Sequence, residues 1–286
     1  STVLEVLKTE KPFPFNINNA IKISGNKSSN IEELWKIIKT MQFFLKFIAQ
    51  SPNINFDHEI YAYEGHDINE NRTFFYLRPE KEYTLRPNRI LEYSVLKGNV
   101  GKIINLISSN KIYFRSLFGV DADLITYADI MNACAAFESQ YDSFYGEFKD
   151  NTKKATKRKM IKLITDNKDS FAPEELTHYE DILNGFRNYR DTLKQRIEHA
   201  LSEFVDIYGD EYIKFDFEQD YPNMPTRIKD ARNALDHGNK EHSLSHNTFL
   251  DAELLRAITY MLILKEADVP NTQIRQCLKK LSRFPY

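Results

Sequence analysis

Residues 250–267 read LDAELLRAITYMLILKEA and contain the clearest structural signal in the chain. Alternating steps of four and three residues separate the apolar positions Leu250, Leu254, Ala257, Met261 and Leu264. This spacing predicts an α-helix that buries one face, because residues three and four apart lie on the same side of a helix. Such a helix needs other elements to pack against it.

The same rhythm recurs in two longer stretches upstream. One runs from Leu124 to Phe148, and the other runs from Leu176 to Phe204. Each is predicted to form one helix with a buried face. Together with the first stretch, they predict a helical bundle over residues 110–286.

Residues 1–109 have a mixed pattern. Short β-branched and aromatic segments at 2–8, 21–23, 59–64 and 73–77 are typical of strands. Residues 31–48 have helical spacing instead. The predicted fold class is therefore mainly α, with the C-terminal bundle preceded by a smaller α+β segment.

The overall composition excludes several classes of protein. The 286 residues include 39 Lys+Arg and 41 Asp+Glu, for a formal net charge of −2, so nucleic acid could be attracted only by a local patch. Nine glycines against 20 Phe and 16 Tyr favour packed helices over a disordered chain. Two cysteines, Cys134 and Cys277, exclude a disulfide scaffold and a Cys-rich zinc module. No apolar run approaches the ~20 residues of a membrane helix, so we expect a cytoplasmic protein that does not enter a membrane.

Two charged residues interrupt the apolar stripes. Glu138 lies within the stripe that ends at Phe148, and Arg190 lies within the one that ends at Phe204. A charge on a buried face is costly and is normally paired. We expect Glu138 to pair with Arg190 and fix the register of the two helices. The alternative is that Glu138 orients a functional arginine elsewhere.

Residues 153–162 carry six positive charges, while acidic residues gather in 206–220. One interpretation is a solvated helix face. The other is a patch that follows a phosphate backbone. The candidate phosphate contacts are Lys153, Lys154, Lys157, Arg158 and Lys159.

Residues 232–238, RNALDHG, hold the strongest candidates for chemistry. Pro225 is predicted near the start of a helix and Gly238 just after its end, which places His237 in the last turn. On a continuous helix, Arg232 and His237 would point about 140° apart. They can converge on one ligand only if the helix end unwinds or a second copy of the chain completes the site.

Two other interpretations of this histidine are open. A histidine at a helix C-terminus can simply bond the last carbonyls and complement the helix dipole. His237, His242 and His246 also lie within ten residues. Three imidazoles could ligate a catalytic metal such as zinc.

The order Arg232-Asn233-x3-His237, followed by Gly238, resembles the R-x4-6-H signature of the HEPN superfamily in its Arg-Asn-x-x-x-His form. The surroundings resemble the ApeA-like HEPN group, whose aromatic-acid helix is similar to Ala-Phe-Glu at 136–138 and whose closing helix is similar to residues 260–267. The resemblance covers residues 110–286. Residues 1–109 resemble the last part of the larger domain that precedes HEPN in ApeA-type proteins, which leaves open that the chain is a piece of a longer protein.

This resemblance implies a metal-independent endoribonuclease without a cofactor. Arg232 and His237 would be the catalytic pair, and Asn233 matches the polar position after the arginine. In the alternative to a pair with Arg190, the arginine that Glu138 restrains would be Arg232. RNA supplies its own nucleophile in the 2′-hydroxyl, so His237 could move protons near neutral pH. Arg232 could hold two phosphate oxygens. The expected products carry a 2′,3′-cyclic phosphate and a 5′-hydroxyl.

The resemblance also implies partners. They are RNA, with structured RNA such as tRNA as the expected substrate, and a second copy of the chain that forms a homodimer through the motif face. Many members of the superfamily act in anti-phage defence or as toxins. Two alternatives stay open: a non-catalytic HEPN-type module that binds RNA or a partner, and a metal hydrolase built on the three histidines.

Overall fold

A computed structural model describes residues 3–8, 19–24, 31–50, 59–62, 73–76, 91, 93–96, 98–114, 117, 127–148, 150–217, 220–236 and 246–281. The chain divides into two compact units, Ser1–Lys39 and Thr40–Tyr286. The sequence predicted a boundary between an α+β segment at residues 1–109 and a helical domain at residues 110–286. That boundary stays a prediction.

The first unit contains an antiparallel strand pair. Strands β1 (Val3–Lys8) and β2 (Asn19–Ser24) pair along their whole lengths. Helix α1 (Ile31–Ala49) begins in this unit and continues into the next. Its first turn carries Glu32 and Glu33, where negative charge complements the helix dipole.

The second unit begins with small elements. Strands β3 (Glu59–Ala62) and β4 (Thr73–Tyr76) form a second antiparallel pair. Helices α2 (Tyr93–Leu96) and α3 (Val100–Ser108) follow. Both helices contribute to the same apolar core as the C-terminal helices.

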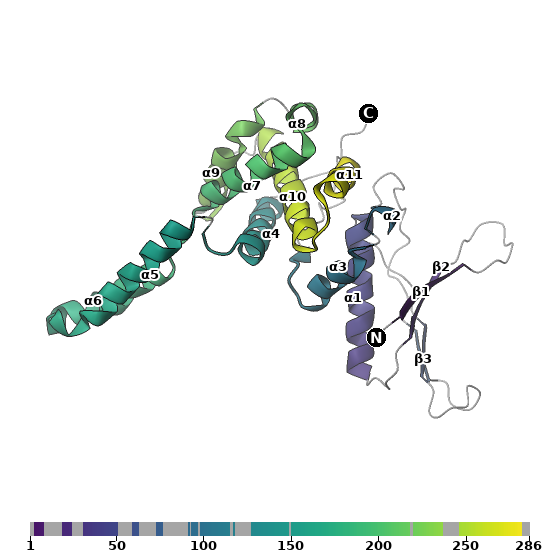
Figure 1. Cartoon of the computed structure of the whole chain (residues 1–286), viewed down its shortest axis with the longest axis horizontal. Coiled ribbons are helices and arrows are strands. Elements are labelled where there is room, and N and C mark those ends of the chain that lie inside the picture. The colour runs from purple at the N-terminus through teal and green to yellow at the C-terminus, as the bar shows by residue number, and fades with distance from the viewer. Residues whose placement is uncertain are drawn as a thin grey trace. The chain divides into compact units, whose positions relative to one another are not determined.

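The remaining helices form the predicted bundle, which confirms the mainly α fold class. Helix α4 covers the first stripe, while Leu124, at its predicted start, lies outside the described residues. Figure 1 shows how the bundle helices are arranged in space. They are α4 (Tyr127–Tyr145), α7 (Leu193–Tyr208), α8 (Asp210–Phe217), α9 (Met224–Asp236), α10 (His246–Glu266) and α11 (Asn271–Leu281).

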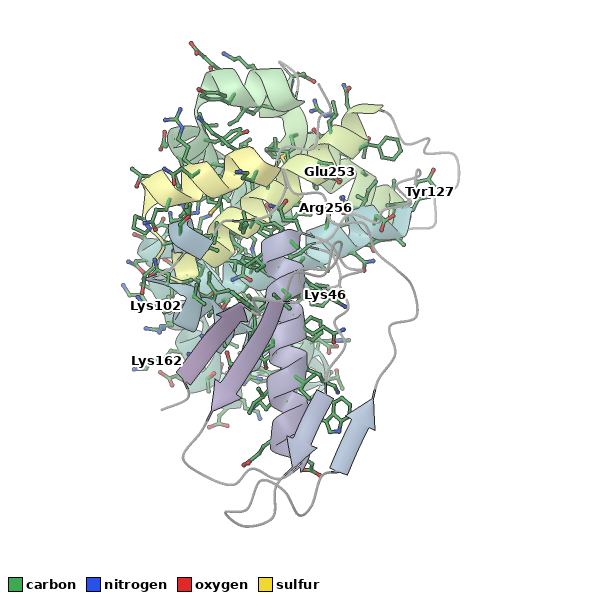
Figure 2. All side chains as sticks on the ribbon, turned by 90° about the vertical axis from the view of Figure 1, so that its right-hand side faces the viewer. Lys46, Lys102, Tyr127, Lys162, Glu253 and Arg256 are labelled. Carbon is green, nitrogen blue, oxygen red and sulfur yellow. The ribbon has the colours of Figure 1, made fainter. Side chains whose placement is uncertain are left out.

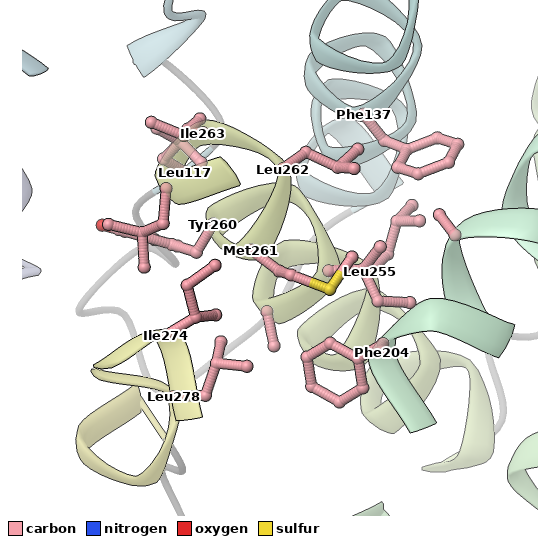
Figure 3. Close-up of a cluster of buried hydrophobic side chains, with 14 of the residues drawn as sticks. Leu117, Phe137, Phe204, Leu255, Tyr260, Met261, Leu262, Ile263, Ile274 and Leu278 are labelled. Atoms are coloured by element: carbon pink, nitrogen blue, oxygen red, sulfur yellow. The ribbon is translucent and has the colours of Figure 1, made fainter. Parts of the chain in front are cut away.

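Helix α10 lies at the centre of the core. Figure 3 shows Phe137 of α4, Phe204 of α7 and Ile274 of α11 around its side chains. Every residue from Leu254 to Leu264 is buried. The prediction of a single buried face is therefore wrong for this helix: neighbours surround it on all sides, as expected for a helix at the centre of a bundle. Among the described residues, no helix has the length and apolarity needed to span a membrane.

The predicted single helix over residues 176–204 is also wrong. The structure has two helices there, α6 (Pro173–Arg187) and α7. A capping box begins α7: the Gln195 amide N donates to Thr192 Oγ1 at 3.3 Å, and the Thr192 amide N donates to Gln195 Oε1 at 3.0 Å. Arg190 lies in the connection between the helices.

Helices α5 (Asn151–Asp166) and α6 lie side by side as a hairpin (Figure 1), joined through a short 3₁₀ turn at Lys168–Ser170. Tyr179 and Leu183 are the buried residues of α6. In α5, the buried residue is Lys157. This α5–α6 hairpin carries the basic run identified in the sequence.

Candidate functional site around Arg232

Helix α9 positions the arginine of the candidate site. A 3₁₀ turn, Tyr221–Asn223, leads into the helix at the place that the sequence predicted. Met224, Ile228 and Ala231 are buried, and their spacing of four and three residues forms the face that packs on the bundle. Arg232 follows directly after this buried face and lies near its edge.

A two-pronged ion pair fastens α9 to α10. Arg227 Nε and Nη2 donate to the two carboxylate oxygens of Asp251, each at 2.7 Å. Arg227 Nη1 also donates to the carbonyl oxygen of Asp220 at 3.1 Å. The Asp251 side chain is only 4% exposed, so the pair fixes α9 against the core. Sequence reasoning missed this pair, although an aspartate next to the apolar Leu250 was a usable signal.

The guanidinium of Arg232 lies between two carboxylates. Its Nη2 is 3.2 Å from Glu138 Oε2 on α4, and its Nε is 3.7 Å from Asp236 Oδ2 on α9. The Arg232 side chain is 33% exposed and the Glu138 side chain 17%. Neither of these two contacts with described residues uses Nη1, which is a further donor for an anionic ligand.

The predicted pair between Glu138 and Arg190 is therefore wrong. Arg190 Nη1 lies 3.4 Å from Asp142 Oδ2 instead. Arg190 lies in the connection between α6 and α7 and therefore belongs to no helix face. The prediction placed it in an apolar stripe because it assumed one continuous helix. The alternative prediction, that Glu138 contacts an arginine elsewhere in the chain, agrees with the observed contact between Glu138 and Arg232.

Cys134 lies one turn before Glu138 on α4 and is buried. Burial raises the pKa of the Cys134 thiol to about 12, and the charge of Arg232 opposes this shift while Glu138 and Asp236 add to it. A thiol with this pKa stays protonated near neutral pH. Cys134 therefore contributes an apolar wall beside the charged groups and not a nucleophile.

The other predicted site residues are placed less completely. Asn233 follows Arg232 on α9 and is exposed. His237 and His242 lie outside the described residues, and His246 begins α10 with its side chain outside them. Within the described part of the chain, no group of three or more His, Cys, Asp or Glu could hold a metal ion. Convergence of Arg232 with His237 and the three-histidine site both stay predictions.

The structure sorts the basic run into two sets. Lys157 Nζ donates to Glu147 Oε2 at 2.7 Å and is buried, and Lys153 Nζ donates to Asp191 Oδ1 at 2.7 Å. These two lysines tie α5 to the connections at its base. Lys154, Arg158 and Lys159 are exposed, and so is Lys162 (Figure 2).

Comparison with known proteins identifies the family. The model of the Apea-like HEPN family matches residues 131–273, which is half of the chain and includes Glu138, Arg232, most of α4 and all of α5 to α10. A search of curated proteins found no match, and a search of solved structures found none. HEPN domains are generally nucleases of the ribonuclease type, and they typically bind RNA and dimerise. The chain belongs to the Apea-like HEPN family.

Proposed function

We propose that this protein is a metal-independent endoribonuclease in which Arg232 and His237 act on the phosphodiester of RNA. The observation that carries the proposal is the placement of Arg232: a half-shielded guanidinium held by Glu138, with Nη1 free of both ion pairs, inside the matched HEPN region. The role follows that of the family, in anti-phage defence or as a toxin, with structured RNA such as tRNA as the substrate.

The chemistry needs few groups. A base removes the proton of the 2′-hydroxyl, the 2′-oxygen forms a bond to phosphorus, and the bond from phosphorus to the 5′-oxygen breaks as that oxygen takes up a proton. His237 is the residue for these proton transfers because imidazole titrates near neutral pH. Arg232 stabilises the negative charge that builds on the phosphate oxygens. The products end in a 2′,3′-cyclic phosphate and a 5′-hydroxyl.

A homodimer through the face that carries α9 completes the site in this proposal. Arg232 and His237 are five residues apart, so one regular helix would direct them about 140° apart. Two copies facing one another would bring an arginine and a histidine to each phosphate. HEPN domains typically dimerise, which supports this arrangement.

The direct test is incubation of the full chain with total cellular RNA in EDTA, followed by analysis of the fragment ends. We expect discrete fragments that end in a 2′,3′-cyclic phosphate. Fragments that carry a 3′-hydroxyl and a 5′-phosphate, or cleavage that appears only after Zn²⁺ is added, would contradict the metal-independent mechanism. Binding of RNA without any cleavage would favour the non-catalytic alternative.

Glu138 is proposed as a positioning residue for Arg232. Replacing Glu138 with alanine is expected to lower kcat about 10- to 100-fold, because a small displacement of a catalytic group has effects of this size. Glu138→Gln keeps one acceptor oxygen and should recover part of the loss, with KM for RNA little changed in both variants. Equal losses in the two variants, or a loss confined to KM, would contradict a positioning role.

The exposed cations of α5 are proposed as an RNA contact. Lys154, Arg158 and Lys162 are four residues apart in turn, so they form one row along the helix with about 6 Å between neighbours. Replacing all three with alanine should weaken RNA binding and reduce the slope of log K against log salt concentration by about 2. Fluorescence anisotropy with a labelled RNA at several salt concentrations measures this slope.

Lys157 provides the matched control for this experiment. Its charge is buried against Glu147, so Lys157→Met removes a charge from the same helix without removing a phosphate contact. The salt slope of this variant should equal that of the wild type. A slope that falls as much for Lys157→Met as it does per residue for the triple variant would show that the row is not the contact.

A further inference from the structure

The α5–α6 hairpin exposes an unusual amount of apolar surface. Ten large apolar side chains are exposed among the described residues, and six of them lie between residues 160 and 189. Leu163 is 59% exposed, Ile182 55% and Met160 38%. The four large aliphatic residues of α5 all escape full burial, and the residue that is buried in this helix is a lysine. Among the described elements, α5 and α6 pack mainly on one another, which leaves such residues uncovered.

Three of these residues share one side of the hairpin. Met160 and Leu163 directly precede the half-buried Ile161 and Ile164, and Ile182 directly precedes the buried Leu183. In two antiparallel right-handed helices that face each other, the residue before an inward-facing one lies on the same side of the pair in both helices. Met160, Leu163 and Ile182 therefore form one continuous apolar strip, which we call the hairpin face.

The charges around the hairpin face differ between its two helices. α5 carries six cations and one aspartate, whereas α6 carries four acidic residues and one arginine. The ion pairs of the α5 cations go to Asp191 and Glu147, outside α6, and Arg187 of α6 contacts Glu180 within its own helix. The opposite charges of the two helices are therefore not neutralised within the hairpin by these contacts.

Lys159 and Asp181 border the hairpin face on opposite outer edges. Lys159 directly precedes Met160, and Asp181 directly precedes Ile182. Each charged residue therefore lies about 100° further around its own helix, away from the other helix of the same hairpin. Both are exposed. Lys159 and Asp181 of one chain are therefore directed away from each other. Each can form an ion pair with a residue of a neighbouring molecule.

We propose that the hairpin face binds the hairpin face of a second copy of this chain. A two-fold axis parallel to the helices places the basic α5 of one copy over the acidic α6 of the other, and sets Lys159 beside Asp181 of the other copy. A two-fold axis across the helices would instead stack α5 on α5, where like charges repel. The charge pattern is thus self-complementary in one arrangement, as a two-fold interface requires. This interface is distinct from the α9 face and does not depend on nuclease activity.

The test is cross-linking of the full chain at the hairpin face. Ile182→Cys, treated with a short bismaleimide, should give a covalent dimer on a denaturing gel. Cys134 and Cys277 are both buried, so the introduced thiol is the reactive one. Leu176→Cys is the matched control, because Leu176 is an exposed leucine of the same helix about 120° away from Ile182. It should give little dimer, and Leu163→Glu in the Ile182→Cys chain should abolish the product.

A charge exchange tests the arrangement itself. In the Ile182→Cys chain, Lys159→Asp or Asp181→Lys alone brings like charges together across the two-fold axis, and each should reduce the cross-linked dimer severalfold. Co-expression of the two variants with tags of different size should restore a mixed dimer, in which every 159–181 contact is again opposite in charge. Equal cross-linking of Ile182→Cys and Leu176→Cys, no dimer at all, or no preference for the mixed dimer would overturn the proposal, as would cross-linking to a different protein.

Discussion

Replacing Arg232 with alanine is expected to reduce the rate of RNA cleavage about 100- to 1000-fold, the usual cost of removing one preorganised group that stabilises transition-state charge. Replacing His237 with alanine should reduce it about 100- to 10,000-fold, as expected for loss of general acid–base catalysis. The loss should appear in kcat, because in the proposed mechanism both residues act mainly on the charge and protons of the transition state. Single-turnover cleavage of a labelled RNA measures both rates.

Two further variants separate the chemistry of Arg232 from its charge. Arg232→Lys keeps a positive charge but loses the planar fork that contacts Glu138 and, in the proposed mechanism, also holds a phosphate, so its activity should stay close to that of Arg232→Ala. Lys229→Ala is the matched control, since Lys229 is a half-exposed cation on the same helix that contacts Asp230. Its activity should be that of the wild type.

The surroundings of Arg232 make it necessary to check that each variant still folds. Arg232 is a third exposed and its partner Glu138 is mostly shielded, so loss of the arginine leaves a carboxylate that water can reach only in part. The circular dichroism spectrum and the mass of the assembly in solution should be unchanged in every one of these Arg232, His237 and Lys229 variants. A folded Arg232→Ala or His237→Ala protein that cleaves RNA at the rate of the wild type would contradict the catalytic assignment.

The apolar spacing in the sequence was sufficient to predict the bundle. It located α4 and α10, since each buries residues at steps of three and four, while Pro225 indicated the start of α9. It could not show that α10 is buried on every side. A helix that is apolar on all faces also has apolar residues at steps of three and four, so the two cases give the same pattern. The run from Ala257 to Leu264, apolar except for Thr259, was the signal for central burial.

The wrong prediction of one helix over residues 176–204 and the wrong partner for Glu138 both reflect what a local sequence pattern leaves undetermined. The apolar rhythm continues by chance from α6 into α7, and only the local sequence Thr192-x-x-Gln195 records the helix start between them. The contact of Glu138 with Arg232 joins residues 94 positions apart. Such a contact depends on which helices pack together, and no local pattern determines that. The family resemblance predicted Arg232 as a site residue, and the fold shows that Arg232 contacts Glu138.

The largest expected effect on stability concerns a buried charge on α7. The Arg196 side chain is fully buried, and its Nη2 lies 3.0 Å from Asp142 Oδ1 on α4. None of its three nitrogens has an aligned hydrogen bond to a described residue, so this contact is an ion pair without hydrogen-bond geometry. The ring of Tyr141 lies 5.6 Å from the guanidinium carbon and adds a cation–π contact.

Asp142→Ala is expected to lower the free energy of unfolding by about 3 kcal/mol, the lower end of the range for breaking a buried pair, because the Asp142 side chain is itself 33% exposed. The cost arises from leaving the guanidinium of Arg196 without a counter-charge in the core. Urea denaturation followed by circular dichroism measures the change. Arg190→Ala is the control: Arg190 contacts the same carboxylate from an exposed position, so its loss should cost about 0.5 kcal/mol or less.

A second replacement distinguishes an unpaired charge from a simple loss of packing. In the Asp142→Ala background, Arg196→Met removes the buried charge and retains most of the side-chain volume against Tyr141. The double variant should recover most of the lost stability, because an apolar residue in place of a buried ion pair is often neutral or stabilising. If the double variant is less stable than Asp142→Ala alone, then Arg196 stabilises the bundle through its packing and its ring contact, and the ion pair with Asp142 contributes little.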